Sequence, residues 1–428
     1  MPRLVRDRTT WLLYVQLGLW GFFLYGFGPV VPLLRDEQGT TAAVAGLHST
    51  ALAVGGLLGG ALIPQLTRRL GRPRTMWLAL GGLALATAML VSSTSLPATL
   101  TAAALASTAG WTAVSCAVSE LTSHHGPVAP TAITEANAAA VGFGMLAPLL
   151  IGLSTRLWDT WRPGFATLIL LIAATATVTG VRRRPRTPSR HVPDPGAGTS
   201  PGSPASPGPA VPSGYAVPVG PVASPGSGGS PGSGVGGEAK GPLPRAYWMA
   251  WSLLGVTGSI EVCLSLWAAD VLRDHAGMSP GGASATVAAI VGGMLAGRLA
   301  GARIALRVRP VPLLLAALGV SAAGLVLFWS SPVGWLAAAG LIVLGLGNAM
   351  HYPLVISLAM AGAPGRSDRA AATASYSVAI GFGAAPLLLG WVADQTGPHL
   401  AFLLLPALIL AAVLIVIRLG RTLPEPVT

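Results

Sequence analysis

Apolar segments long enough to cross a lipid bilayer are the feature that most limits how this chain can fold. They lie in two sets of six, at residues 11–34, 42–66, 74–94, 97–121, 129–153, 163–181, 247–271, 282–304, 311–329, 334–361, 370–393 and 399–417. About 20 helical residues span the ~30 Å hydrocarbon layer, where every backbone polar group must be paired within the protein. Leu, Ala and Gly dominate the segments without two-residue alternation. The sequence therefore predicts membrane-spanning helices and no barrel.

The distribution of charge supports this interpretation. Only 9% of the residues are charged, whereas a soluble domain carries about 25%. The net charge of +12 would suit a nucleic-acid partner, but the basic residues gather in loops on one side of the predicted membrane. With the N-terminus inside, the exceptions are Arg35, Arg156, Arg162 and Arg273, which face outward, and Arg298, which lies within a helix. The positive-inside rule thus explains the charge. We expect a plasma (inner) membrane protein with cytoplasmic termini and no nucleic-acid partner.

The two halves of the chain repeat one another. LRDEQGTTAAVAG at 34–46 aligns with LRDHAGMSPGGAS at 272–284, and VGFGMLAPLLIG at 141–152 aligns with IGFGAAPLLLG at 380–390. The separations are nearly equal, which predicts an all-α membrane protein with twelve transmembrane helices in two six-helix bundles related by a pseudo-two-fold parallel repeat. We expect the N-terminal bundle at residues 1–181 and the C-terminal bundle at 246–428. Residues 182–245, rich in Pro, Gly and Ser, are expected to form a disordered cytoplasmic linker.

A short motif connects this pattern to a known family. PQLTRRLGRPR at 64–74 resembles the major facilitator superfamily signature G-x-L-A-D-R-x-G-R-R, with Pro64 in place of the Gly and Arg68 in place of the Asp. With the six-plus-six arrangement and the basic central loop, the resemblance covers essentially the whole chain, without indicating a subfamily. It implies alternating access around one central site. It also assigns the matching residues to a cytoplasmic gate loop, namely Arg69, Gly71, Arg72 and Arg74, although the gating contact of the missing Asp is lost.

Ionisable residues inside the predicted helices are the main functional candidates, because each costs free energy unless it is paired or hydrated. Glu261 lies near the middle of segment 247–271, among small and apolar residues. A carboxyl there can take up and release a proton as its access to water changes; alternatively, Glu261 is a structural partner of Arg298. Arg298 could instead extend to the inner interface, or bind an anionic substrate. His351 is the next titratable candidate for proton coupling.

Polar and aromatic side chains in segments that line the cavity of this superfamily are candidates for substrate contact. Asn348, His351 and Tyr352 are spaced i, i+3 and i+4, so a continuous helix places them on one face. Interhelical hydrogen bonds are the alternative role for these three, and packing is the alternative for the aromatic stripe of segment 11–34. The full set of cavity candidates is Gln16, Trp20, Phe23, Asn137, Asn348, Tyr352 and Tyr376.

These features predict a secondary transporter, with proton-coupled export of a small apolar or amphipathic organic compound as the first hypothesis. The second is a proton-coupled importer of a small organic anion held by Arg298; a non-transporting receptor and a passive channel are further alternatives. Segment 104–110 has Ala106 where drug–proton antiporters of the superfamily carry Arg, so that coupling device is missing. No phosphate-binding loop or metal-ligand spacing occurs. We expect a monomer and no enzyme, cofactor or metal, with a small-molecule substrate, protons and bilayer lipid as partners.

Overall fold

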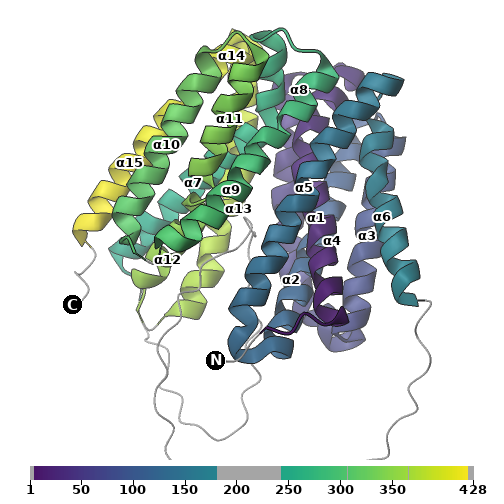
Figure 1. The fold of residues 1–428 in the computed structure, drawn as a ribbon, viewed down its shortest axis with the longest axis vertical. Helices are drawn as coiled ribbons and strands as arrows, with labels where there is room; N and C mark the ends of the chain where they lie inside the picture. The colour runs from purple at the N-terminus through teal and green to yellow at the C-terminus, as the bar shows by residue number, and fades with distance from the viewer. Residues whose placement is uncertain (1–3, 181–241, 306, 365, 423–428) are drawn as a thin grey trace, which may run out of the picture.

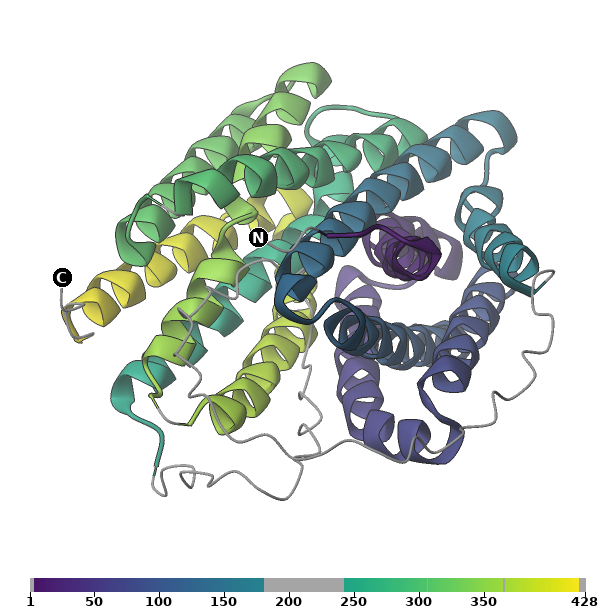
Figure 2. The ribbon, with the colours of Figure 1, turned by 60° about the horizontal axis from the view of Figure 1, so that its bottom comes forward.

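The fold consists of two helical bundles that lie side by side (Figures 1 and 2). The computed structural model describes residues 4–180, 242–305, 307–364 and 366–422, and no strand occurs in these ranges. The N-terminal bundle contains α1 (Arg8–Gln38), α2 (Ala42–Leu70), α3 (Arg72–Ser92), α4 (Leu96–His125), the short 3-10 helix η1 (Gly126–Val128), α5 (Ala129–Trp158) and α6 (Arg162–Gly180). The C-terminal bundle contains α7 (Arg245–Asp274), α8 (Pro280–Thr286), α9 (Ala288–Ala305), α10 (Pro310–Ser330), α11 (Gly334–Asn348), α12 (His351–Ala361), α13 (Ser367–Thr396), α14 (Pro398–Ala401) and α15 (Leu404–Thr422).

Twelve membrane-length spans occur within the described residues, which confirms the predicted all-α fold class. Three of the spans differ from prediction because two helices share each of them: α8 with α9, α11 with α12, and α14 with α15. Proline accounts for two of the breaks. A proline has no amide hydrogen to donate to the carbonyl four residues earlier. Pro353 therefore leaves the carbonyl of Ala349 without its helical bond, and Pro406 does the same for Phe402. The break at Val287 has no such residue, and we have no physical account of it.

Helix α1 is the centre of the N-terminal bundle and also reaches the other bundle. It is buried along almost its whole length and packs against α4, α5 and α6 on one side and α7 on the other. Helix α2 pairs with α13, and α5 with α8 and α9, so α1, α2 and α5 carry the N-terminal side of the interface between the bundles. Most of the predicted linker at 182–245 lies outside the described residues.

The bundles approach each other most closely at the end of the molecule away from both termini, which is the upper end in Figure 1. A Cβ atom added to Gly28 of α1 would lie 2.1 Å from the carbonyl oxygen of Ser265 in α7. One added to Gly152 of α5 would lie 2.5 Å from the carbonyl oxygen of Gly281 in α8. Glycine at these positions therefore permits backbone-to-backbone packing that any side chain would block.

Candidate functional site

Four charged residues join α1 to α7 at this closed end; we refer to Arg35, Asp36, Asp270 and Arg273 as the inter-bundle ion cluster. Arg35 donates to both carboxylate oxygens of Asp270, at 2.6 and 3.1 Å. Arg273 in turn lies 2.7 Å from Asp36 of the other bundle. Asp270 is 3% exposed, so its charge depends on these partners. The two arginines belong to the repeated LRD sequences, and the repeat thus supplies one cation from each half.

Hydrogen bonds between α2 and α13 close the same end. The hydroxyl of Ser49 donates to the carbonyl of Phe382 at 2.5 Å, and that of Thr50 to Gly383 at 2.6 Å. Asp394 of α13 accepts from the first two backbone amides of α2. The positive end of the α2 dipole favours a carboxylate at this position. Backbone carbonyls and hydroxyls therefore connect the bundles along this helix pair.

Near the termini, the ion pairs lie within the N-terminal bundle. Arg6 donates to Glu135 at 2.8 Å, and Tyr14 donates to the same carboxylate at 3.0 Å. Asp7 accepts from Thr10 and contacts His124, and the hydrogen bonds from Thr10 lower the pKa of Asp7 to about 2. These contacts hold α1 to α4 and α5 and do not cross to the other bundle. The ion pairs of the cluster thus join the two bundles at the closed end, whereas these ion pairs near the termini join helices of one bundle.

Four buried or half-buried residues meet where the bundles face each other at mid-length; we call Tyr25, Glu261, Arg298 and Tyr352 the central polar group. Glu261 of α7 is 8% exposed and Tyr25 of α1 is 5% exposed. Arg298 of α9 interacts electrostatically with both of them, and Glu261 also interacts with Tyr352 of α12. The group therefore draws on four helices and on both bundles.

The central polar group has donors without acceptors. The Nε and Nη1 atoms of Arg298 and the hydroxyl of Tyr25 are buried and have no hydrogen-bond partner in the described part of the chain. Among the ion pairs found there, none involves Arg298. A buried guanidinium without an acceptor costs free energy. Such an arrangement can receive an acceptor from elsewhere, and Glu261 can hold a proton beside it.

Tyr25 did not emerge from the sequence because it lies off the aromatic stripe of Gln16, Trp20 and Phe23. Its ring occupies space that Gly144 of α5 leaves free, since a Cβ atom at Gly144 would lie 2.3 Å from the ring. The sequence nevertheless contained a signal that pointed to Tyr25. A tyrosine hydroxyl inside an apolar helix needs a partner, as does any intramembrane polar group.

The three candidates of segment 334–361 do not share one helix face. The break at 349–350 separates Asn348, the last residue of α11, from His351, the first of α12. Nε2 of His351 lies 3.2 Å from the hydroxyl of Ser321 in α10, inside the C-terminal bundle, whereas the neighbouring Tyr352 interacts with Glu261. Asn348 is buried, and among the residues that the structure describes neither its amide nitrogen nor its oxygen has a hydrogen-bond partner. The spacing of the three residues therefore does not by itself place them on one face, because that prediction assumed a continuous helix.

The candidates of α1 lie in the N-terminal bundle. The ring of Phe23 stacks on Trp20 and Phe27 and packs against Phe165 of α6, with centroids 5.5–5.6 Å apart. The side-chain oxygen of Gln16 has no hydrogen-bond partner within the described ranges, and Gln16 lines a cavity of about 320 Å³ toward the terminal end. Trp20 also lines a small hollow that α13 closes. Phe23 thus packs within one bundle, although the repeat aligns it with Glu261.

The remaining candidates lie at different depths. Asn137 of α5 is buried and Tyr376 of α13 is 58% exposed. The gate-loop residues Arg69, Arg72 and Arg74 are exposed at the junction between α2 and α3. Gly71 at this junction has φ 76°, a conformation that side chains rarely adopt.

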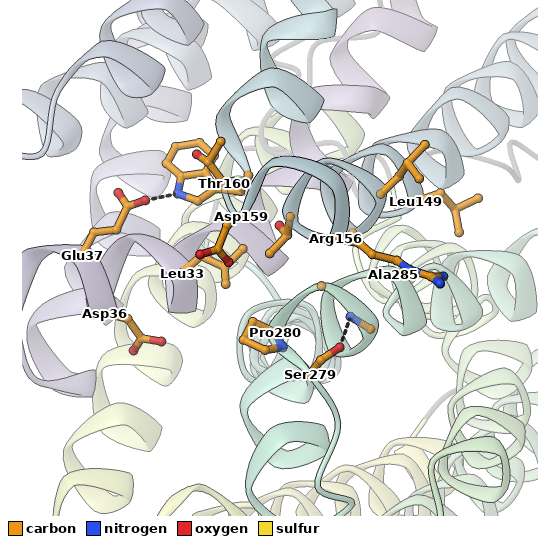
Figure 3. Close-up of a pocket in the computed structure, with 16 residues that line it drawn as sticks. Leu33, Asp36, Glu37, Leu149, Arg156, Asp159, Thr160, Ser279, Pro280 and Ala285 are labelled. Atoms are coloured by element: carbon orange, nitrogen blue, oxygen red, sulfur yellow. Dashed lines mark hydrogen bonds between the residues drawn. The ribbon is translucent and has the colours of Figure 1, made fainter.

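A cavity of about 720 Å³ lies at the closed end between α1, α5 and α8 (Figure 3). Two of its three acidic residues, Asp36 and Glu37, already have partners. Asp36 belongs to the inter-bundle ion cluster, and Glu37 accepts from Trp161 at 2.9 Å and from Arg162 at 2.8 Å. Within the described ranges, no three His, Cys, Asp or Glu residues come together in a way that could hold a metal ion.

Two bundles of membrane-length helices, joined at one end and enclosing polar residues at mid-length, define a secondary membrane transporter. The family model described as Major Facilitator Superfamily matches residues 13–379 and 249–428, and the chain belongs to that family. This confirms the resemblance seen in the sequence.

Solved structures share the fold at low sequence identity. A bacterial homologue of the human lysosomal transporter Spinster, in an inward-facing and unoccupied conformation, has a TM-score of 0.70 and 13% identity over 99% of this chain and 98% of its own. The nucleoside transporter NupG has a TM-score of 0.69 and 12% identity over 96% and 98%. The human organic anion transporter MFSD10 has a TM-score of 0.59 and 18% identity over 97% and 100%. No curated protein matches the chain.

Proposed function

We propose that this chain is a proton-coupled secondary transporter that works by alternating access and carries a small amphipathic organic compound with an acidic group into the cell. The moving units are the bundles at 1–181 and 246–428, connected by the linker at 182–245. The observation that carries the proposal is the central polar group, where unpartnered donors of Arg298 and Tyr25 lie beside a buried Glu261.

Glu261 is the proton site in this proposal. A ligand or proton shifts a conformational equilibrium only when its affinity differs between the two states. Glu261 meets Tyr25 across the bundle interface, so relative movement of the bundles changes its surroundings. Alternating access also requires that one end of the bundle interface can open. The inter-bundle ion cluster meets this requirement in the proposal, because its contacts join only that end and can break.

The membrane orientation follows from the charge pattern and is tested by labelling. We expect cysteines introduced at Gly39, Asp159 and Gly277 to react with an impermeant reagent from outside intact cells. A cysteine at Gly71 should react only after permeabilisation. The reverse pattern would place the termini outside and contradict the proposed cytoplasmic termini.

Transport in proteoliposomes with an imposed pH gradient tests the function directly. Substrates would be screened as matched sets of acids, neutral compounds and bases. We expect uptake of an acid to rise when the outside is made acidic, and Glu261→Gln to abolish this proton-driven net uptake while sparing exchange of substrate for substrate. Glu37→Gln, which removes a carboxylate paired within one bundle, is the control and should retain coupling. Full proton-driven uptake by a folded Glu261→Gln protein would remove Glu261 from the mechanism.

Export of an apolar or amphipathic compound in exchange for protons is the second candidate. Its supporting observation is the apolar surface that α1, α4 and α13 form beside the interface, with Trp20, Trp111 and Phe382. In that case a neutral or cationic substrate and the proton would compete for Glu261. Acidifying the outside of the vesicles would then drive loss of such a compound from their interior and would not drive uptake of an acid.

A further inference from the structure

We infer that Arg298 and the hydroxyl of Tyr25 form one binding site for the acidic group of the substrate, and that ionised Glu261 competes with that group for Arg298. This inference rests on the proposed function and adds two elements to it. One is a substrate contact from the N-terminal bundle, Tyr25. The other is the sign of the coupling between proton and substrate.

The donors support this assignment. Nε and Nη1 of Arg298 and the hydroxyl of Tyr25 are buried without hydrogen-bond partners in the described residues, although the two side chains interact electrostatically. A guanidinium presents its nitrogens in a plane that matches a carboxylate or sulfonate, and a phenol adds a third donor. An oxyanion placed between them satisfies donors from both bundles at once. The ligand class is therefore an organic monoanion of the carboxylate or sulfonate type.

Charge balance gives the order of events. With Glu261 ionised, its charge and that of Arg298 cancel, and a bound anion would leave a net negative charge inside the membrane protein. Such an unbalanced charge is costly in a medium of low dielectric constant. With Glu261 protonated, the anion and Arg298 cancel instead. Proton and anion therefore bind together, which is the linkage that a symporter requires.

The neighbours of Glu261 leave this carboxyl as the group that changes charge. Arg298 of α9, Tyr25 of α1 and Tyr352 of α12 face it, and Glu261 is the one carboxyl among these four side chains. From α13, the residues that meet this part of α7 are Ser377, Gly381 and Phe382. Short helix α8 has no ionisable residue, and those of α14 and α15 are His399, Arg418 and Arg421. His399 stacks on His275 beyond the end of α7, and His351 contacts Ser321 inside the C-terminal bundle.

Equilibrium binding to the purified full-length protein tests the inference without transport. The probe is benzenesulfonate, which is an anion at every pH used, with neutral benzyl alcohol and cationic benzyltrimethylammonium for comparison. We expect benzenesulfonate to bind about tenfold more tightly at about pH 5.5 than at about pH 8 in calorimetric titrations. Glu261→Gln should bind it equally tightly at both pH values. The double variant Glu261→Gln/Arg298→Met should not bind it, and thermal unfolding would show that each variant is folded.

Tyr25 has a matched control on the same helix. Tyr25→Phe removes a hydroxyl for which the described residues supply no acceptor, and it should weaken benzenesulfonate binding about tenfold, which is typical of a hydrogen bond to a charged group. Tyr14→Phe removes a hydroxyl that already donates to Glu135 at 3.0 Å and should leave binding unchanged.

The inference would be overturned by no binding of benzenesulfonate at either pH, by a pH dependence that persists in Glu261→Gln, or by equal affinities for Tyr25→Phe and Tyr14→Phe. Tighter binding of the cation than of the anion would overturn it as well and favour the export candidate. Failure of binding with intact proton-driven flux would reject this inference alone. Intact binding without proton-driven flux would reject the proposed function.

Discussion

The inter-bundle ion cluster and the central polar group both lie between α1 and α7, but they satisfy their charges differently. In the cluster, Arg35 and Arg273 each have a carboxylate partner from the opposite bundle, at 2.6 and 2.7 Å. In the central group, Arg298 has buried nitrogens that no described residue contacts as a hydrogen-bond acceptor. Paired charges stabilise one arrangement of the bundles, whereas unpaired donors are available to a ligand. The comparison predicts that the cluster controls conformation and the central group controls binding.

Breaking the cluster should have the largest effect on the arrangement of the bundles. Asp270→Asn removes the buried carboxylate that holds Arg35, and losing one partner of a buried pair costs about 3 kcal/mol. We expect the closed end to open, which spin labels at Ser95 and Ser330, one on each bundle, would report as a longer distance. Glu37→Gln breaks a partly exposed pair within one bundle and should leave that distance unchanged. An unchanged distance in Asp270→Asn would contradict the role of the cluster.

A side chain at the close approach of α1 and α7 should act in the same direction without touching a charge. The Cβ atom of Gly28→Ala would lie 2.1 Å from the carbonyl oxygen of Ser265, and overpacking of this kind costs about 1–3 kcal/mol. We expect the same pair of spin labels to separate. Gly142→Ala is the control, because its Cβ atom would meet nothing within 4 Å. If both variants behave alike, the close approach does not hold this end closed.

A contact at the terminal end should change stability by about 1 kcal/mol and leave the bundle arrangement alone. Asp7 caps α1 by accepting from Thr10, and the loss of such a cap costs about this amount, reduced here by solvent screening. The folded-state pKa of Asp7 is lowered to about 2 from 3.8. Its contribution is therefore present above about pH 4 and lost as the pH falls toward 2.

Thermal unfolding of the wild type and Asp7→Ala should thus differ at neutral pH and converge in acid. Asp7→Asn keeps a capping oxygen without the charge and should keep most of the stability with less pH dependence. A stability difference that grows in acid would show that the sign of this linkage is wrong.

The smallest effect on stability is expected at the central polar group. Glu261→Gln reproduces the protonated carboxyl in size and hydrogen bonding and breaks none of the ion pairs found in the described residues, so at about pH 5.5 it should change the free energy of unfolding by less than about 1 kcal/mol. The thermal unfolding midpoint of the purified variant measures this. A severely destabilised Glu261→Gln protein that Arg298→Met restores would identify the two residues as a structural pair.

Several features of the site followed from the sequence, each for a physical reason. Glu261 and Arg298 stand out because ionisable residues are rare in apolar segments. The repeated LRD sequence places Arg35 and Arg273 at equivalent helix ends of the two halves. The shared face predicted for Asn348, His351 and Tyr352 assumed an unbroken helix, whereas the structure divides this span at 349–350. Pro353, four residues beyond Ala349, was the available warning.

The sequence by itself determined the number of spans, their division into two repeated halves and the family. It could do so because a bilayer requires each span to pair its own backbone, so the length and polarity of a segment suffice. Only the tertiary structure decided which buried side chains meet: Tyr25 with Arg298, Phe23 with Phe165, and Arg35 with Asp270. These partners come from helices far apart in the chain. Their contacts depend on how each helix is rotated and tilted against its neighbours, which packing determines and hydropathy does not encode.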